Sequence, residues 1–367
     1  MTISHLLFIN TLLATIGLIG GVNVDAQCII KQYEDVEEMV KSCQDIVIDG
    51  VIVPGGEQLQ IALNEGSTLT FRGRTTFTFY EWSGPLVSIS GNGITVRGES
   101  GSLLDGQGQL WWDGQGTWGN VTKPKFFRIQ ATNALFEGIA LHHCPVGCTS
   151  VSSSENVTIR NWIIDNLAGD EGVAPTDKFG HNTDGFGISS SRNIVIEDSS
   201  VYNQDDCVVF NSGKNITVRN MFCHGSHGFS ISVNSSAVED TIVENSIISM
   251  SENGIHVKTH VDAGEGLIRN VLYRNITMLD CKQYGISVEQ NYKNLPAGQP
   301  QNGPPNNNIP IHNLTLENIF GNVLNGAMPV FVLCAQEGCF DWIWKNVNIL
   351  GTTENNCTNY APKGYKC

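Results

Sequence analysis

The chain has 367 residues, of which 41% are hydrophobic and only 16% are charged, so it can bury a large core and is not a disordered polypeptide. Its formal net charge of −15 argues against nucleic acid as a partner, because a phosphate backbone would be repelled. An acidic substrate would need a local basic pocket that acts against this general field.

The first 26 residues contain an extended apolar segment at 6–22, followed by small residues at Val24 and Ala26. This pattern is typical of a secretory signal that is removed before Gln27, although its leading region lacks Lys and Arg. We therefore expect a secreted, extracellular protein with a single domain over residues 27–367. A membrane anchor is the alternative, and we disfavour it because no other segment of the sequence could span a bilayer.

Eleven cysteines and seven Asn-x-Ser/Thr sequons fit an oxidising secretory route. The sequons are Asn120, Asn156, Asn215, Asn234, Asn275, Asn313 and Asn356. Several of them open a strand pattern, which gives those asparagines a structural role as an alternative to glycosylation. The closest cysteine spacings predict disulfides between Cys28 and Cys43, Cys207 and Cys223, Cys334 and Cys339, and Cys357 and Cys367. At least one of Cys144, Cys148 and Cys281 should then be free. None of the cysteine spacings is accompanied by a matching pair of histidines, so the sequence does not indicate a zinc site.

Residues 33–43, "YEDVEEMVKSC", place Val36, Met39 and Val40 at helical spacing. A repeat follows this segment, in which a polar opener, alternating β-branched residues and an Asn, Asp or Gly return as "NGITVRG", "NVTIRNWIIDN", "NIVIEDSSVYN" and "NITVRNMFCHG". The repeat covers 22 residues from Asn193 to Asn215 and 25 from Asn215 to Asp240.

A period of this length predicts a stack of short-stranded coils. Leucine-rich repeats are excluded because their Leu-x-x-Leu-x-Leu signature is absent, and helical repeats fail because the apolar spacing is two. The predicted fold is all-β, a right-handed parallel β-helix whose open end is covered by a short N-terminal helix. Two insertions, 167–181 and 294–310, should form loops on one face, where solenoids often bind ligands.

The segment "YNQDDCVVF" sets two carboxylates, Asp205 and Asp206, directly before a buried strand. Asp184 precedes Asp206 by 22 residues, and His227 follows Asp205 by 22. Residues one coil apart lie ~4.8 Å from each other in a β-helix, so three carboxylates and an imidazole should converge. The strand pattern "GIHVKTH" further along places His256 and Lys258 on the same wall.

Glycoside hydrolysis needs one carboxylic acid to protonate the leaving oxygen and a second carboxylate to activate water or act as nucleophile. Crowding of like charges should keep one proton on this cluster near neutral pH. The competing interpretation is that Asp and Asn are common in the turns of β-helices because their side chains hydrogen-bond the nearby backbone. That interpretation explains any single aspartate better than it explains four groups at matching one-coil spacings.

Six segments, taken in order, resemble the polygalacturonases of glycoside hydrolase family 28, especially the fungal and plant-feeding insect members. They are "LLDGQGQLWWDG" at 103–114, "GHNTDGF" at 180–186, "NQDDC" at 203–207, "GSHGFSI" at 225–231, "HVKT" at 256–259 and "EQNY" at 289–292. The resemblance implies an inverting hydrolase, without metal or other cofactor, that cleaves α-1,4 links between galacturonates in pectin, with endo action favoured by the compact chain.

By position, the resemblance makes Asp205 the general acid. It assigns Asp184 and Asp206 to the pair that orients and deprotonates the attacking water. His227 becomes the partner that tunes the acid.

The same resemblance makes Lys258 and Tyr292 substrate contacts and places Asn182 and His256 with the substrate-binding residues. The implied partner is an acidic polysaccharide bound by a monomer, with no nucleic acid and no membrane.

Three positions depart from the family pattern. Gly187 ends a motif that usually reads Asn-Thr-Asp-Gly-Phe-Asp, and Ser226 replaces the first glycine of Gly-His-Gly. His256 replaces the arginine of Arg-Ile-Lys, which removes a guanidinium that can grip a carboxylate with two parallel bonds. A polyuronide should then bind less well at that position, or only in acid.

These departures leave two alternatives, a pectin-binding pseudoenzyme and a hydrolase of a related polymer such as rhamnogalacturonan or xylogalacturonan. A calcium-dependent pectate lyase shares the predicted fold, but it would give an unsaturated product and lose activity to a chelator.

Overall fold

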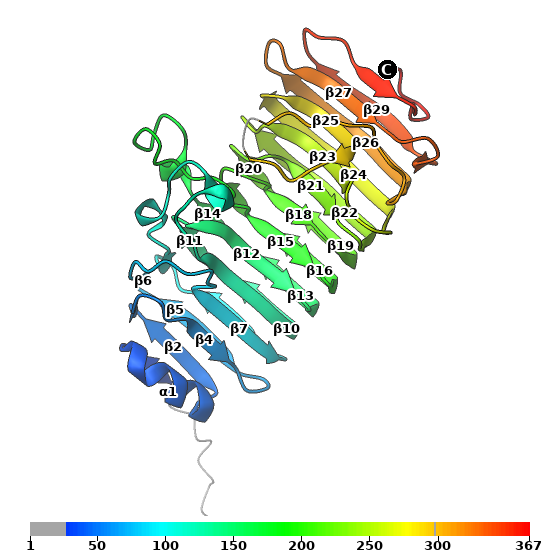
Figure 1. The fold of residues 1–367 in the computed structure, drawn as a ribbon. Coiled ribbons are helices and arrows are strands. Elements are labelled where there is room, and N and C mark those ends of the chain that lie inside the picture. Colours follow the sequence, from blue (N-terminus) through cyan, green and yellow to red (C-terminus); the bar gives the residue numbers. More distant parts are fainter. Residues whose placement is uncertain (1–26, 297–298) are drawn as a thin grey trace, which may run out of the picture.

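The computed structural model describes residues 27–296 and 299–367, and the predicted secretory leader at 1–26 lies outside them. The described chain is a right-handed parallel β-helix, as predicted, with coils stacked from the N-terminal helix to the C-terminal strand (Figure 1). Parallel pairings arrange the strands in three rows along the stack. None of the helices in these described segments is long and apolar enough to cross a membrane.

Row 1 carries the candidate site. Its strands are β4 (Leu59–Ala62), β7 (Val87–Asn92), the first half of β10 (Lys125–Glu137), β12 (Val146–Ser152), β15 (Phe186–Ser189), β18 (Val208–Phe210), β21 (Phe229–Val233), β23 (Asn253–His260), β25 (Tyr284–Tyr292), β27 (Met328–Leu333) and β30 (Asn356–Thr358).

Rows 2 and 3 complete each coil. Row 2 contains β1 (Cys28–Ile30), β2 (Asp45–Asp49), β5 (Thr68–Arg72), β8 (Thr95–Gly98), the second half of β10, β13 (Glu155–Arg160), β16 (Ser191–Glu197), β19 (Gly213–Arg219), β22 (Ala237–Ser249), β24 (Leu267–Cys281), β26 (Ile311–Val323), β28 (Cys339–Phe340) and β29 (Ile343–Leu350). Row 3 contains β3 (Ile52–Val53), β6 (Arg74–Phe77), β9 (Leu103–Asp105), β11 (Ala140–His142), β14 (Ile163–Asp165), β17 (Ser200–Tyr202), β20 (Phe222–His224) and the ends of β22, β24, β26 and β29.

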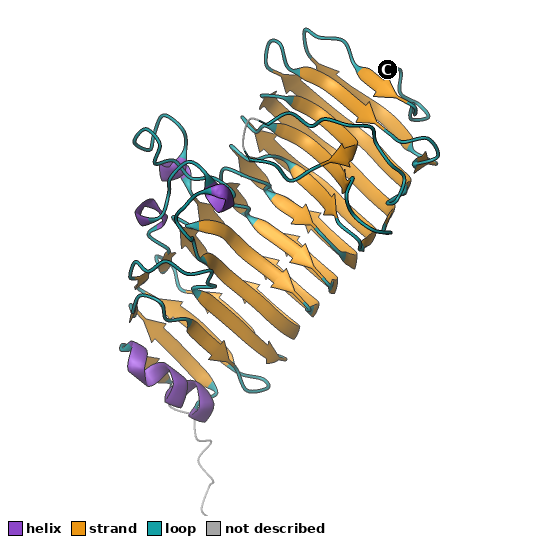
Figure 2. Cartoon of the chain, in the orientation of Figure 1, coloured by secondary structure: helices purple, strands orange, loops and turns teal. Residues whose placement is uncertain are grey.

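The helix predicted over 33–43 is present as a 3-10 turn, η1 (Tyr33–Asp35), and an α-helix, α1 (Val36–Ser42). Val36 and Val40 are buried against the first coils. Three further 3-10 turns, η2 (Gly108–Leu110), η3 (Gly116–Trp118) and η4 (Leu167–Gly169), lie in loops beside the stack (Figure 2).

Alternate side chains of every strand point into the stack and form the core. Ile159, Ile196, Val218 and Val243 occupy one column through four consecutive coils, and each is fully buried. Burial of one such side chain contributes about 1.5–3 kcal/mol, so these columns supply most of the stabilisation of the solenoid. The alternation also fixes which side chains face outward, which is what positions the site.

Two regular rows of polar side chains run along the outside. The outer charge row alternates in sign through Arg97, Glu137, Arg160, Glu197, Arg219, Glu244, Arg274, Glu317 and Lys345. An asparagine row lies at the corner between rows 1 and 2, where each side-chain amide donates to the one before it, through Asn92, Asn133, Asn156, Asn193 and Asn215. Asparagine suits this corner because it tolerates the left-handed backbone conformation found at the last four positions.

Five disulfides are present. The four pairs expected from spacing, Cys28–Cys43, Cys207–Cys223, Cys334–Cys339 and Cys357–Cys367, are joined. Cys144 and Cys148, which the sequence left unassigned, form the fifth. Cys281 is the free cysteine of the described chain, and it is buried.

Candidate active site

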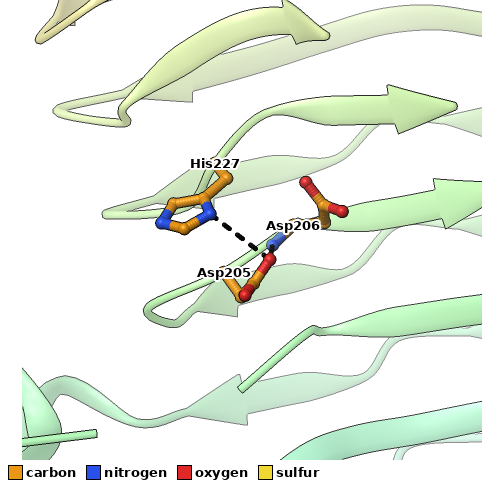
Figure 3. Close-up of side chains that lie close together, drawn as sticks. All are labelled: Asp205, Asp206 and His227. Carbon is orange, nitrogen blue, oxygen red and sulfur yellow. Dashed lines mark hydrogen bonds and ion pairs between the residues drawn. The ribbon is translucent and has the colours of Figure 1, made fainter. Parts of the chain in front are cut away.

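The predicted cluster forms in the turns that precede β15, β18 and β21. The backbone amide of Gly185 donates to the carbonyl of Asp206 at 2.8 Å, and the amide of His227 donates to the carbonyl of Asp205 at 2.7 Å. The turns therefore stack one coil apart, as the 22-residue spacings predicted. Figure 3 shows His227 reaching from its own coil toward Asp205, with Asp206 beside them.

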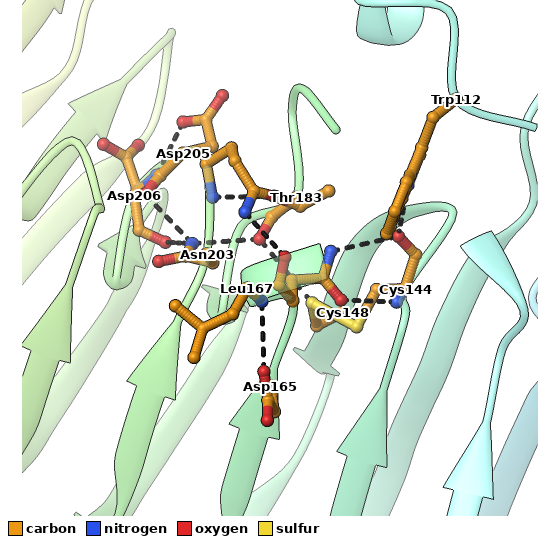
Figure 4. Close-up of a disulfide and its surroundings, with 11 residues drawn as sticks. Trp112, Cys144, Cys148, Asp165, Leu167, Thr183, Asn203, Asp205 and Asp206 are labelled. Atoms are coloured by element: carbon orange, nitrogen blue, oxygen red, sulfur yellow. Dashed lines mark hydrogen bonds between the residues drawn. A yellow bond between two sulfur atoms is a disulfide. The ribbon is translucent and has the colours of Figure 1, made fainter. Parts of the chain in front are cut away.

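Asn203 shapes the turn that carries Asp205 and Asp206. Its buried side-chain amide donates to three carbonyl oxygens, those of Thr183 at 2.9 Å and of Asp205 and Asp206 at 3.0 Å each. The preceding coil is held in turn by Cys148, whose amide donates to the carbonyl of Asp184 at 2.7 Å. Figure 4 shows Asn203 beside Thr183, Asp205 and Asp206, with the Cys144–Cys148 disulfide nearby. The site thus rests on backbone held in place by two adjacent coils.

Asp205 is held as a carboxylate in the free protein. Its Oδ1 lies 3.3 Å from Nδ1 of His227, and its Oδ2 accepts a hydrogen bond from Asn182 at 2.8 Å. Burial opposes ionisation, but the charge and hydrogen bond of His227, the charge of Lys258 and the hydrogen bond from Asn182 together lower the pKa of Asp205 below its usual range.

His227 is correspondingly held as a cation. Its second nitrogen, Nε2, lies 3.1 Å from Glu252. Burial lowers the pKa of the imidazole, but the charges of Asp205 and Glu252 raise it to about 10. His227 therefore carries a proton throughout the neutral pH range, directly beside Asp205.

Asp206 forms a separate ion pair with Lys258. Nζ of Lys258 lies 2.9 Å from Oδ2 and 3.1 Å from Oδ1, and the Ser230 hydroxyl also donates to Oδ1. Both charged side chains are nearly inaccessible, at 6% and 4% exposed. Burial disfavours the ammonium, yet Asp206 raises the pKa of Lys258 above its usual value. The ammonium also lies 5.2 Å from the ring centre of Tyr292.

Asp184 is the carboxyl group of the cluster with the raised pKa. Burial and the charges of Asp205 and Asp206 together raise its pKa well above the usual range. Asp205 and Asp206 each have a cation at bonding distance, whereas Lys258 reaches Asp184 only as a weaker long-range charge. Of Asp184 and Asp205, crowding therefore favours a proton on Asp184.

Asn182 is fixed by a loop that the sequence analysis did not connect to the site. The backbone amide and hydroxyl of Thr117 donate to its Oδ1 at 3.0 and 3.1 Å. Lys123 anchors this loop through Asp113 at 2.8 Å and the carbonyl of Gly116 at 2.9 Å. Any Cβ at Gly116 would lie 2.2 Å from Oδ1 of Asn182, so glycine is required for this close approach.

His256 lies on the same strand and face as Lys258 but pairs with a different carboxylate. Its Nε2 is 3.2 Å from Oε1 of Glu289, which also accepts a hydrogen bond from Ser287 at 2.8 Å. Its ring packs edge-on against Tyr292, with ring centres 6.2 Å apart. All the residues expected at the site are thus brought together, with His256 in a second ion pair beside the aspartate cluster.

The other two departures from the family pattern are uncharged residues, and Ser226 directly precedes His227. Ser226 is fully buried, and its hydroxyl hydrogen-bonds that of Ser251 at 2.9 Å. Gly187 pairs with Ser150 and Val209 in neighbouring strands, with ordinary contact distance for an added Cβ.

Oxygen and nitrogen atoms of Asp205, Asp206 and His227 lie within 4.8 Å of one another, a spacing that a metal ion could use. A ligand histidine must be neutral, however, and His227 has a pKa of about 10. Lys258 already neutralises Asp206. These three side chains are therefore better suited to proton transfer than to metal binding.

Sequence reasoning missed Asn203, Glu252 and Glu289 as parts of the site. Glu252 follows His227 by 25 residues, the length of the preceding coil, so the stacking rule could have found it. Glu289 stood in the quoted "EQNY" segment, but nothing in the sequence paired it with His256.

Comparisons with known proteins agree with this geometry. A family model, Glycosyl hydrolases family 28, matches residues 43–367. A polygalacturonase of Phaedon cochleariae is 41% identical over 353 residues, covering 94% of each chain. A probable endopolygalacturonase B of Aspergillus flavus is 38% identical and covers 99% of this chain and 100% of its own.

Solved structures show the same fold. Endopolygalacturonase I from Stereum purpureum, complexed with two galacturonate, superposes with a TM-score of 0.82 at 28% identity, covering 90% of this chain and 96% of its own. The endo-xylogalacturonan hydrolase from Aspergillus tubingensis, at 20% identity and a TM-score of 0.75, covers 93% of this chain and 98% of its own and shares the fold. From the family match and the full-length relatives, the chain belongs to glycoside hydrolase family 28.

Proposed function

We propose that this protein is an endo-acting polygalacturonase that hydrolyses α-1,4-galacturonosyl links in polygalacturonic acid and pectin, with inversion. The observation that carries the proposal is the division of charge in the aspartate cluster. Asp206 is paired with Lys258, burial and two charged neighbours raise the pKa of Asp184, and Asp205 faces the imidazolium of His227. Relatives named polygalacturonase and endopolygalacturonase along nearly the whole chain support it.

In the proposed mechanism Asp206 is the base. Its carboxylate takes a proton from the attacking water as the water oxygen forms its bond to the anomeric carbon. Asp184, in its protonated form, orients that water. Lys258 holds both oxygens of Asp206 in place for the arriving water proton.

Asp205 is the proposed general acid, and it needs a proton that it lacks in the free protein. Because the resting pKa values hold the proton on the imidazole, His227 supplies it from Nδ1, across the 3.3 Å contact to Oδ1, only as negative charge develops on the leaving glycosidic oxygen. Asp205 then passes it to the glycosidic oxygen as the bond to the anomeric carbon breaks. The imidazole is left neutral and Asp206 protonated, so release of the Asp206 proton and reprotonation of His227 restore the starting state.

Lys258, Tyr292, Asn182 and His256 are the proposed substrate contacts, because all four line the face that carries the aspartates. The alternatives that the sequence left open, a pseudoenzyme and a hydrolase of a related pectic polymer, are not favoured. Every acidic and basic group that hydrolysis requires is in place.

We also propose that the protein is secreted and acts as a monomer outside the cell. Five disulfides in a chain of this size support an oxidising destination.

The sequons divide into two groups that we expect to differ in glycosylation. The side-chain nitrogens of Asn156, Asn215, Asn275 and Asn313 donate to stacked Asn neighbours at 2.8–3.0 Å. Asn120, Asn234 and Asn356 are exposed and are not among these stacked asparagines. Glycans should therefore be found at the latter three, and peptide mapping of protein secreted from a glycosylating host tests this. A glycan on a stacked asparagine of the folded protein would contradict it.

Product analysis on polygalacturonic acid tests the activity, using the wild type and Asp205→Asn side by side. The wild type should release saturated oligogalacturonides of mixed length, unaffected by a chelator, and the variant should release almost none. Glu197→Gln, which removes one carboxylate from the outer charge row, is the matched control and should keep full activity. Absence of new reducing ends across pH 4 to 8, a range that spans ordinary carboxyl and imidazole titration at about 4 and 6.5, would exclude the proposal.

A further inference from the structure

A second ion pair, between His256 and Glu289, lies beside the aspartate cluster on the same face of row 1. Ser230 joins the two sites, because it pairs in register with His256 and its hydroxyl donates to Asp206. The ring of Tyr292 touches both, being edge-on to His256 and 5.2 Å from the Lys258 ammonium. A sugar bound next to the cleaved bond on this side must therefore meet the His256–Glu289 pair.

Any positive charge on His256 is matched by the carboxylate of Glu289, so it does not attract a further anion. From its own strand it faces the Asn253 amide at 3.3 Å, and from β25 it faces Glu289, Ser287 and Tyr292. Burial raises the pKa of Glu289, but the contacts with His256, the hydrogen bond from Ser287 and the charge of Lys258 together hold that pKa below its usual range. The pair is thus neutral when the imidazole is protonated and carries one negative charge when it is not.

The neighbouring cation, Lys258, is also paired with a carboxylate. The ammonium of Lys258 is bonded to both oxygens of Asp206. A free uronate carboxylate is gripped well by a cation whose charge is not already matched, and neither cation here meets that condition. Glu289 would in addition repel such a carboxylate. A methyl ester has the same shape at the ring and carries no charge, so it meets no such repulsion.

We propose that the His256–Glu289 pair makes the sugar position beside the cleaved bond tolerant of methyl-esterified galacturonate, so that partly methyl-esterified pectin is cleaved as readily as the free polyuronate. This proposal rests on the polygalacturonase activity proposed above. It assigns His256 and Glu289 to the choice between esterified and free uronate and gives them no part in the bond-breaking step.

The test is kcat/KM on polygalacturonate and on pectin of about one-third random methyl esterification, for the wild type and Glu289→Gln. The wild type should cleave the two within about twofold of each other at pH 5. In the variant a neutral amide replaces the anionic partner of His256, so the imidazole can bind a uronate carboxylate without repulsion from Glu289. Its preference for polygalacturonate should rise about fivefold to tenfold at pH 5.

Two further variants keep this outcome interpretable. Glu317→Gln removes one carboxylate from the outer charge row, where Lys345 lies 3.7 Å away, and it should leave the ratio unchanged. His256→Gln leaves Glu289 unpaired and should shift the ratio toward esterified pectin, which serves as the test if Glu289→Gln does not fold.

An identical substrate ratio in the wild type, Glu289→Gln and His256→Gln at pH 5 would overturn the proposal. So would a wild type that prefers polygalacturonate by tenfold or more at that pH. Failure of the underlying activity is distinguishable, because neither substrate would then yield products.

Discussion

The outer charge row and the aspartate cluster use the same stacking of successive coils and arrive at opposite results. Along the outer row, each charge lies next to one of opposite sign, as in the pair of Arg219 with Glu197 at 2.5 Å. In the cluster, Asp184, Asp205 and Asp206 place three carboxylates together in two adjacent coils. The stacking geometry is therefore common to both regions. The sign and burial of the charges decide whether stacked side chains form stabilising ion pairs or raise the pKa of a carboxyl group.

Exposure separates the two regions further. Arg219 is 45% exposed and its neighbours are partly solvated, so each outer pair contributes about 0–1 kcal/mol. Asp206 and Lys258 are nearly inaccessible, and loss of either partner leaves an uncompensated buried charge. Substitutions that remove or invert a charge should accordingly affect the cluster strongly and the outer row weakly.

The largest expected effect is from Asp206→Asn. An amide cannot accept the water proton, so kcat should fall about 10³-fold, within the ~10²–10⁴-fold that general base catalysis contributes. Steady-state assays on polygalacturonate measure this, with Glu197→Gln as the control on the outer row. Equal losses in the two variants would contradict the contrast between the regions.

Lys258→Met should have the next largest effect. Without the ammonium, Asp206 loses the cation that is bonded to both of its oxygens, and its buried carboxylate is left without a charged partner. The kcat on polygalacturonate should then fall about 10²-fold, as steady-state assays at pH 5 would measure. An unchanged kcat would show that Lys258 is not needed to hold the base.

Glu252→Gln should shift the pH dependence of folding stability, and it should lower kcat less than Asp206→Asn and Lys258→Met do. His227 has a pKa of about 10 against an ordinary value of 6.5, so its charged form stabilises the fold fully below pH 6.5, and that stabilisation is lost as the pH rises to 10. Removing Glu252 should lower the pKa of His227 and start this loss at a lower pH. Melting temperatures between pH 6 and pH 10 measure the shift, and superimposable curves would contradict it.

The part of the site that could be predicted from sequence is the part built by uninterrupted coils. Asp184, Asp205 and His227 were placed correctly because 22 residues separate each stacked pair. Lys258 is 52 residues from Asp206, across coils of unequal length, so its ion pair could not be derived from spacing. The raised pKa of Asp184 depends on its burial and on the charges of both neighbouring aspartates, and spacing does not give burial.

Arg219→Glu makes the outer row resemble the cluster, and it should have the smallest effect. It places three carboxylates in consecutive coils, at 197, 219 and 244, as the register requires. Solvent screens these side chains, so the variant should lose only about 1 kcal/mol of stability, a few degrees in melting temperature, with kcat unchanged. Salt should reduce the loss because the charges are exposed. A catalytic defect in this variant would mean that the outer row communicates with the site, whereas a purely thermal and salt-sensitive effect would show that stacked like charges acquire a shared proton only where they are buried.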